Sequence, residues 1–299
     1  MDEEARTHRR AVMSTPLDQE RFVPLSSSIA LELGAATAWG AQQQANTDHY
    51  LALRVGRLQE TLLTSLAAAD LPPRFEEYGY ALLVADGLGD TGARASRVAL
   101  SALAHLAVRY GQWNVRVRPD TVADIHDQGA FLYQQAHEAV MRASRTALEL
   151  IDMATSLTAL YIAEGDLFVA HVGHSSAYLF RGGVLIELTV RHTLEEARRA
   201  GRPIAFGQAR SDGRVVVTEA LGGRPVVPDI DIEQRWLESG DRLLLCTNGL
   251  TDAVSDDAIA DTLAACRGAQ ESCEQLIDLV DAAGNHDDAT VLLADYRVK

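Results

Sequence analysis

The sequence predicts an α+β fold built on antiparallel sheets. Strand-like segments follow one another in runs, and helix-like segments do the same, instead of alternating as they do in parallel α/β folds. Gly182-Gly183 separates two apolar segments by two residues, which is typical of a tight hairpin between antiparallel strands. The 299 residues contain no internal repeat and no clean linker. We therefore expect a single domain over residues 29–299, preceded by a flexible N-terminal arm over residues 1–28.

Strands and helices are mixed in the first half of the chain. Alternating or continuous apolar residues predict strands over residues 29–33, 35–40 and 79–85. Apolar residues at helical spacing predict helices over residues 53–69, 93–108 and 127–151. The first of these helices stops at Asp70-Leu71-Pro72-Pro73, a helix-ending signal, and it would form the main part of a helical insertion over about residues 50–80.

The second half of the chain is mainly β, and two helices come late. Short apolar segments predict strands over residues 156–163, 167–172, 177–181, 184–189, 241–246 and 289–296. Helical spacing predicts helices over residues 256–265 and 271–282, whose apolar side chains would cover a sheet. This succession of strands without intervening helices is the reason for expecting antiparallel pairing.

Charge and lysine content exclude several classes of protein. The chain has 27 basic and 42 acidic residues, a formal charge of −15, and its only lysine is Lys299. Without an interior lysine, P-loop nucleotide hydrolysis, protein-kinase chemistry and pyridoxal chemistry each lack a group that they require. A chain this acidic offers no basic stripe, so we expect no nucleic-acid partner. The acidic surplus suits divalent cations, and it is equally compatible with plain surface charge.

Cysteines and apolar segments bear on the compartment. Cys246, Cys266 and Cys273 are odd in number and lack a Cys-x-x-Cys spacing, so they predict neither a disulfide framework nor a zinc site. No apolar run approaches the roughly 18 to 20 residues that span a bilayer. Asp18 and Glu20 interrupt the region where a signal peptide would need its apolar segment. These observations predict a cytoplasmic protein with no membrane partner.

Four aspartates stand beside predicted strands. Asp86 directly follows an apolar strand and precedes Gly87, Asp287 and Asp288 come just before the last strand, and Asp48 follows the first strand region. A carboxylate at a strand end beside glycine can direct its oxygens and a nearby backbone carbonyl at a cation. Taken one at a time, each of these aspartates is more typical of an exposed turn. Their joint order along the chain is the more informative observation.

That order resembles a known family. The segment Val84-Ala85-Asp86-Gly87-Leu88-Gly89 resembles the metal-binding signature of the PPM-type (type-2C) metal-dependent protein serine/threonine phosphatases. Residues 40–48, 155–160, 167–179, 240–252 and 284–291 resemble further motifs of the family in the same order. The resemblance covers residues 34–296. It implies a central antiparallel β-sandwich flanked by helices on both outer faces, with a site at one end that holds two Mn²⁺ or Mg²⁺ ions.

The resemblance also implies roles for individual residues. Asp86 would bridge the metal ions, the Gly87 carbonyl would bind one of them, and Asp287 would be a second carboxylate ligand, which makes the two aspartates the implied catalytic residues. Asp48 falls where the family has an acidic residue near the metals. Two cations about 3.5 to 4 Å apart would activate a shared water to attack phosphoserine or phosphothreonine directly. The implied partner is a phosphorylated protein, the substrate of a cognate serine/threonine kinase.

The chain departs from the family pattern at functional positions. Asn248 replaces a metal-binding aspartate but keeps an amide oxygen, and His174 replaces the aspartate of a third metal position. Gln43 replaces the arginine that grips the phosphate, and Arg94, close to the metal-binding signature, is a candidate for that role. Asp288, where the family has asparagine, would restore negative charge. Two functions therefore stay open: an active, divergent phosphatase, or a catalytically weak or inactive phosphatase-like binding or regulatory module.

Two further groups of residues carry hypotheses of their own. Residues 190–218 are implied to form a flap region beside the site, and its arginines are candidates to receive a phosphorylated or acidic partner; a solvated surface helix would have the same composition. These arginines are Arg191, Arg198, Arg199 and Arg202. The histidines lack the helical pair of a metal site, so we expect His171 to be an ordinary core residue.

Overall fold

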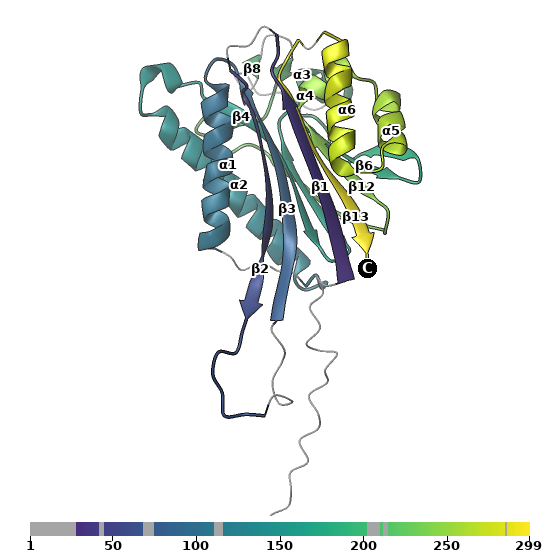
Figure 1. Ribbon diagram of the computed structural model, residues 1–299. Helices are drawn as coiled ribbons and strands as arrows, with labels where there is room; N and C mark the ends of the chain where they lie inside the picture. Colours follow the sequence, from purple (N-terminus) through teal and green to yellow (C-terminus); the bar gives the residue numbers. More distant parts are fainter. Residues whose placement is uncertain are drawn as a thin grey trace, which may run out of the picture.

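Two antiparallel sheets packed face to face form the centre of the protein, and helices cover both outer faces (Figure 1). The computed structural model describes residues 28–41, 45–67, 75–110, 116–201, 210–211, 215–284 and 286–299. This is the β-sandwich that the resemblance implied, and the prediction of antiparallel sheets is confirmed, because every strand pair in the described residues runs antiparallel.

One sheet has the strand order β1-β13-β12-β6-β7. In that order its strands are Ile29–Ala38, Ala289–Val298, Arg242–Cys246, Ser176–Arg181 and Val184–Glu187. β1 and β13 come from opposite ends of the described chain and pair over their whole length, from Ile29 opposite Val298 to Ala38 opposite Ala289. The strands expected over residues 29–33 and 35–40 are therefore one continuous strand.

The other sheet has the strand order β11-β5-β4-β3-β2, with a short β10 beside β4. The strands of this sheet are β11 (Asp231–Trp236), β5 (Asp166–Val172), β4 (Ala154–Ala163), β3 (Phe75–Leu88), β2 (Asp48–Gln59) and β10 (Leu221–Gly222). Two-residue strands β8 (Arg210–Ser211) and β9 (Val216–Val217) pair separately in the expected flap region. β2 is an edge strand, so its outer side faces no other strand of this sheet.

Helices α1 (Gly92–Arg109) and α2 (Val122–Ser144) pack on the outer face of the six-stranded sheet, and α4 (Asn248–Ala253), α5 (Asp256–Ala265) and α6 (Ala269–Ala282) pack on the outer face of the five-stranded sheet (Figure 1). A 3₁₀ turn, Leu148–Leu150, follows α2, and the short α3 (Leu194–Arg199) lies in the expected flap region. Side-chain capping fixes where α5 begins, because Ser255 accepts a hydrogen bond from the backbone nitrogen of Ala258.

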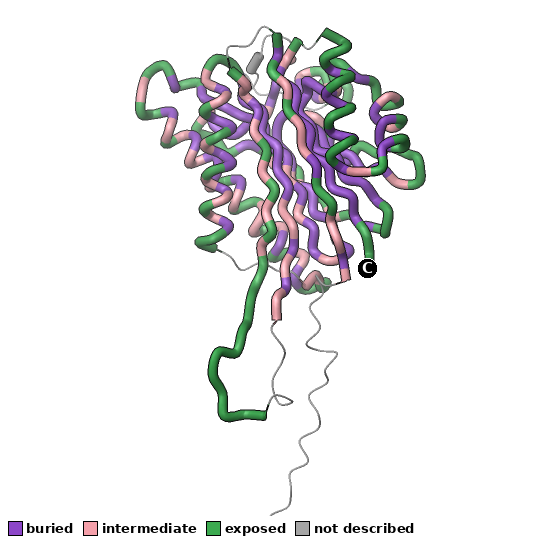
Figure 2. The backbone as a smooth tube through the Cα atoms, in the orientation of Figure 1, coloured by how far each residue is buried: buried purple, intermediate pink, exposed green. Residues whose placement is uncertain are grey.

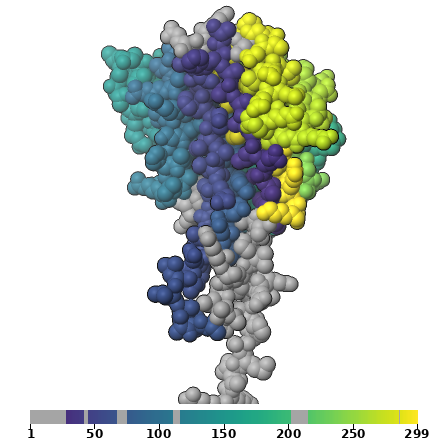
Figure 3. All heavy atoms as spheres, viewed as in Figure 1, coloured from purple at the N-terminus to yellow at the C-terminus, as the bar shows by residue number. Residues whose placement is uncertain are grey.

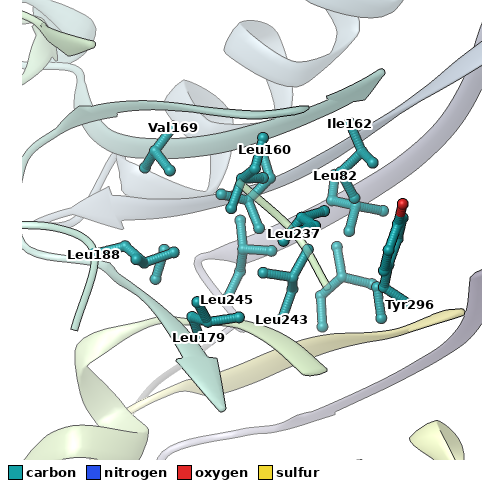
Figure 4. Close-up of a cluster of buried hydrophobic side chains, with 14 of the residues drawn as sticks. Leu82, Leu160, Ile162, Val169, Leu179, Leu188, Leu237, Leu243, Leu245 and Tyr296 are labelled. Atoms are coloured by element: carbon teal, nitrogen blue, oxygen red, sulfur yellow. The ribbon is translucent and has the colours of Figure 1, made fainter. Parts of the chain in front are cut away.

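Alternation along the strands divides the apolar residues between three layers. In β3, Leu82 and Val84 point into the space between the sheets, whereas Leu83 and Ala85 pack beneath α1 and α2. Figure 4 shows the layer between the sheets, where leucines of both sheets meet Tyr296. In Figure 2 the buried positions accordingly concentrate along the strands, whereas exposed positions lie on the helices, on connecting loops and along the segment that projects beyond β2.

The helix expected over residues 53–69, and with it the helical insertion over residues 50–80, is wrong. β2 and β3 form an antiparallel pair there, from Asp48 opposite Asp86 to Gln59 opposite Phe75. From His49 to Val55 every second residue of β2 is half-buried, which is the period of a strand rather than of a helix. Residues 60–67 continue beyond the strand and project from the body of the protein (Figures 1 and 3).

Several expectations fall on residues outside those described. They are most of the N-terminal arm expected over residues 1–28, together with Gln43 and Arg202. None of the helices in the described ranges is long and apolar enough to cross a membrane.

Candidate metal centre

Asp48 and Asp86 lie directly opposite each other at the end of the sandwich. They are partners in the β2–β3 pairing, and Asp86 is in turn opposite Ser156 on β4. Asp86 comes two residues after Val84, so strand alternation directs it into the same space between the sheets that the apolar core occupies further along. Both carboxylates are buried. The structure therefore brings together two of the aspartates that the sequence analysis singled out.

The environment of Asp48 is prepared for a cation. The Thr247 hydroxyl donates to Asp48 Oδ2 at 2.7 Å, and the backbone nitrogen of Thr290 donates to the Thr247 hydroxyl oxygen at 2.9 Å. Among the described residues no donor reaches Asp48 Oδ1, although that oxygen is buried. Burial raises the pKa of Asp48 to about 7. The Thr247 and Thr290 side chains lower this pKa by hydrogen bonding, and the negative charges of Asp288 and Asp287 raise it. A bound cation would favour the ionised form and supply the missing partner.

His174 stands beside Asp86. Its Nδ1 lies 3.7 Å from Asp86 Oδ2 and 2.7 Å from the Ser156 hydroxyl oxygen, and its side chain is almost completely buried. The turn before it requires glycine, because Gly173 has φ 109° and a Cβ there would lie 2.3 Å from Ser156 Oγ. The structure thus places the imidazole next to one of the two buried aspartates.

Glycines bring β3 and α1 into direct backbone contact next to Asp86. A Cβ on Gly87 would lie 2.1 Å from the carbonyl carbon of Gly92, the first residue of α1. The Asp86 backbone carbonyl accepts a hydrogen bond from the Thr155 hydroxyl at 2.8 Å. Arg94 is exposed in the first turn of the same helix, so the structure places a guanidinium group on the element that abuts the metal-binding signature.

Asp287 and Asp288 have different surroundings. Asp288 is buried, and its carboxylate accepts hydrogen bonds from the Gly40 nitrogen at 2.9 Å, the Thr47 nitrogen at 2.7 Å and the Thr47 hydroxyl at 2.9 Å. It thereby ties both ends of the segment 40–47 to the start of β13, and it adds negative charge near the site without a free oxygen to offer. Asp287 is half-buried, and its Oδ1 accepts from the Asp288 nitrogen at 2.9 Å.

Asn248 is buried at the beginning of α4. Its amide nitrogen donates to Asp252 Oδ2 at 3.1 Å, within the same helix. Its neighbour Gly249 touches β13, because a Cβ there would lie 2.1 Å from the Asp288 carbonyl oxygen. Asn248 thus lies close to the start of the last strand, and its side chain carries no charge with which to bind a metal.

Oxygen donors dominate the site, as a hard divalent cation requires. Within the ranges that the structure describes, no three His, Cys, Asp or Glu side chains are already arranged around one metal position. Carboxylates at Asp48 and Asp86, backbone carbonyls and water would therefore have to supply most ligands. The chemistry of this donor set and the orphaned oxygen of Asp48 fit Mg²⁺ or Mn²⁺.

The sequence analysis missed the hydroxyl groups that hold the carboxylates. Thr247 binds Asp48, Ser156 binds His174, and the hydroxyl groups of Thr37 and Thr290 are 2.8 Å apart. Each of these residues continues the inward-facing register of a strand beyond its last buried apolar residue. That register was the signal that could have found them.

His171 is the core residue that the sequence predicted. It is buried, its Nδ1 is 2.8 Å from the Thr158 hydroxyl oxygen, and its ring packs 4.9 Å from the ring of His192. Burial lowers the pKa of His171 to about 3, and the neighbouring His192 lowers it further.

The described part of the flap region offers less free positive charge than expected, because Arg199 pairs with two glutamates of its own helix.

Comparison with protein families places this arrangement in context. A family model described as "Stage II sporulation protein E (SpoIIE)" matches residues 77–297. Over 225 residues the chain is 33% identical to the serine/threonine protein phosphatase PstP of Mycobacterium tuberculosis (strain CDC 1551 / Oshkosh), an alignment that covers 72% of this chain and 40% of PstP. The match thus spans less than half the length of that relative. The serine/threonine phosphatase stp of Listeria monocytogenes serotype 4b is 29% identical over 217 residues, 72% of this chain and 83% of stp.

A solved structure shares the fold over almost the whole of its length. The catalytic domain of the serine/threonine protein phosphatase PstP, in complex with two manganese ions, superimposes with a TM-score of 0.65 and 26% sequence identity. The superposition covers 90% of this chain and 99% of that domain.

Proposed function

This chain belongs to the PPM-type protein phosphatases, within which it matches the SpoIIE family, and from that membership we propose that it is a metal-dependent phosphatase of phosphoserine and phosphothreonine in proteins. The observation that carries the proposal is the buried pair Asp48 and Asp86 at the end of the sandwich. The similarity to a catalytic domain that binds two manganese ions supports it. Its substrate would be a cytoplasmic phosphoprotein that a serine/threonine kinase has modified.

The residues divide the work between metal binding and substrate binding. Asp86, the Gly87 carbonyl and Asp287 would hold two Mn²⁺ or Mg²⁺ ions, with Asn248 contributing an amide oxygen and Asp48 completing the set. Bound ions of this kind supply a Lewis acid that lowers the pKa of water and neutralises phosphate charge.

The surrounding groups orient these ligands. Thr247 holds Asp48 through the 2.7 Å hydrogen bond to Oδ2 and so directs Oδ1 away from itself. Asp288 fixes the segment 40–47, in which Gln43 would contact the phosphate through a neutral amide. Arg94 would supply the positive charge that Gln43 lacks. His174, beside Asp86, would bind a third and weaker ion or end that site.

A second function is favoured by a specific observation. Asn248 is uncharged and its amide nitrogen is engaged with Asp252, and the oxygens of Asp288 are used by the backbone of another segment. A site with fewer charged ligands binds metal more weakly. The alternative is therefore a catalytically weak or inactive module that recognises a phosphorylated partner through the same residues.

One experiment separates the two functions. Mn²⁺ binding to the full chain is measured by calorimetry, and hydrolysis of a phosphothreonine peptide is measured on the same preparation. Asp86→Ala should abolish both, whereas Asp90→Ala, an exposed aspartate four residues further on, should change neither. Turnover that is lost only in Asp86→Ala establishes the phosphatase. Metal binding without turnover supports the recognition module, and the absence of both rejects a metal-dependent function.

A further inference from the structure

A cavity of about 100 Å³ lies between the six-stranded sheet and the two helices that cover it, and none of the candidate metal residues lines it. Leu103 and Ala107 of α1 form one wall, and Ile125 and Gly129 of α2 form another. The cavity is partly open to solvent, so a small molecule has a way in. Protein interiors are normally packed without voids of this size, because every missing contact costs stability. The cavity therefore needs an explanation from its own residues.

Small side chains on the sheet make the floor of the cavity. On the outer face, Leu83 of β3 is opposite Ala159 of β4. Ala159 is opposite Ala170 of β5, and Ala170 is opposite Ile232 of β11. All four residues line the cavity. Because two alanines stand in register between two larger side chains, the floor is lowest at its middle.

Small residues also form the roof. Gly129 lies within α2, where glycine is the least favourable residue after proline. A Cβ at this position would lie 3.3 Å from Ile232 Cδ1 at the edge of the cavity. Ala107, a buried small residue of α1, also lines the cavity. Glycine and alanine on the helices and two alanines on the sheet thus line the cavity, and their small size leaves the space open.

The chemistry of the walls selects the occupant. The polar side chains in the lining are Gln128, Tyr133 and Tyr161, and the Tyr133 hydroxyl is already engaged, donating to the Ala170 carbonyl oxygen at 2.6 Å. A buried water needs two to four polar partners, whereas an apolar cavity of about 150 Å³ stays dry and binds benzene. We propose that this cavity is a binding site for a small uncharged apolar molecule, about the size of one aromatic ring.

The test uses benzene as the probe and the full chain without added metal. Because benzene binds the folded state alone, it should raise the melting temperature by about 3 °C at ten times its dissociation constant, and the rise should continue with the logarithm of the benzene concentration. Gly129→Leu fills the cavity from the roof and should abolish the shift. Ala130→Leu adds the same side chain to the exposed neighbouring position of α2 and should leave the shift intact.

A second variant protects the test against misfolding. Ala159→Val adds two methyl groups to the floor and should weaken benzene binding at least tenfold. This variant replaces Gly129→Leu in the test if Gly129→Leu fails to fold. Chemical-shift changes of the methyl groups of Leu103 and Ile125 on adding benzene should report the same site. The proposal is overturned if benzene moves neither the melting temperature nor these methyl signals. It is equally overturned if both filled variants respond to benzene like the unmodified chain. Neither readout depends on metal binding or phosphatase activity.

Discussion

The space between the two sheets has an apolar half and a polar half, and the same strands build both. β3 contributes Leu82 and Val84 to the apolar half, and two residues later it contributes Asp86 to the polar half. β12 contributes Leu243 and Leu245, and Thr247 follows at the next inward position. The backbone geometry is continuous across this boundary. Only the residue types change.

The two halves differ in what they do for the free energy of folding. The apolar half gains stability from burial, since each fully buried leucine contributes about 1.5 to 3 kcal/mol. The polar half must find hydrogen-bond partners for every buried group, and it leaves Asp48 Oδ1 and His171 Nε2 without one among the described residues. Asp48 belongs to the candidate metal centre, where a cation would supply the missing partner, whereas His171 stays neutral among core residues. The comparison thus assigns stability to one half and binding to the other.

The largest effect on stability should come from the apolar half. Leu160 is completely buried between the sheets (Figure 4), so Leu160→Ala should lower the free energy of unfolding by about 2 to 5 kcal/mol. Urea unfolding measures this loss, and calorimetry at low temperature should show an unchanged Mn²⁺ affinity. A Leu160→Ala protein that binds Mn²⁺ ten times more weakly would show that the two halves are not separable.

Replacing Asp48 in the polar half should raise the free energy of unfolding of the metal-free protein, where replacing Leu160 lowers it. Its pKa is raised by burial to about 7, so the folded state holds a proton that the unfolded state releases near pH 4. Stability therefore falls as the pH rises from about 4 to 7, by of the order of 3 kcal/mol. Asp48→Asn should remove this fall and be more stable than the unmodified chain at pH 8. Urea unfolding with chelator between pH 4 and 8 measures the difference.

The control for Asp48→Asn is a matched change at the surface. Asp90 is exposed, and Asp90→Asn should give a stability curve parallel to that of the unmodified chain. Added Mn²⁺ should make the unmodified chain more stable than Asp48→Asn at pH 8, because only the carboxylate gains stability from the cation. If Asp48→Asn follows the unmodified chain at every pH without metal, the carboxylate is not buried as the structure shows.

His171 should give a smaller effect of the other sign. Burial lowers its pKa to about 3, so the folded state stays neutral while the unfolded chain takes up a proton below about pH 6.5. Stability is therefore lost as the pH falls, by roughly 2 kcal/mol at pH 4.5. His171→Phe should flatten this acid limb, which thermal unfolding between pH 4 and 7 measures. An unchanged acid limb would assign the loss to other groups.

Much of the fold was predictable because its signals are local. Alternation and continuous apolar runs predicted β4, β5, β6, β7, β12 and β13, and the motif order predicted the sandwich. The edge strand β11 was missed. β2 was mistaken for a helix because Val55 and Leu58 of β2 and Leu62 beyond it lie three and four residues apart, as on one face of a helix. An edge strand also lacks the continuous buried run of a central strand. Pairing with β3 decides between the two, and pairing is not a local property.

The candidate site was predictable only in its charged members. Asp48, Asp86 and Asp287 stand out in the sequence because aspartate beside a strand end is a recognisable pattern. Thr247 and Ser156 do not, because threonine and serine are common in strands and only the register shows which of them face inward. Asp288 looked like a further charge for the metals, and only its three hydrogen bonds show that it fastens a loop.

Thr247 offers the finest test of the boundary between the halves. Thr247→Val keeps the shape of the side chain and removes the hydroxyl that donates to Asp48 Oδ2. The loss should lower stability at pH 8 by about 1.5 to 3 kcal/mol, since a hydrogen bond to a charged group is worth about that much. It should also weaken Mn²⁺ binding, because Asp48 is no longer held in place.

A double-mutant cycle isolates the contact from the change of polarity. If the hydroxyl acts through the carboxylate, Thr247→Val should cost markedly less at pH 8 in the Asp48→Asn background than in the unmodified chain, because the partner is then uncharged. The same cycle at pH 4, where Asp48 is protonated in the folded state, should show little coupling. Equal costs in both backgrounds at pH 8 would mean that Thr247 only fills space. The polar half would then be ordered by packing, as the apolar half is, and not by hydrogen bonds to its carboxylates.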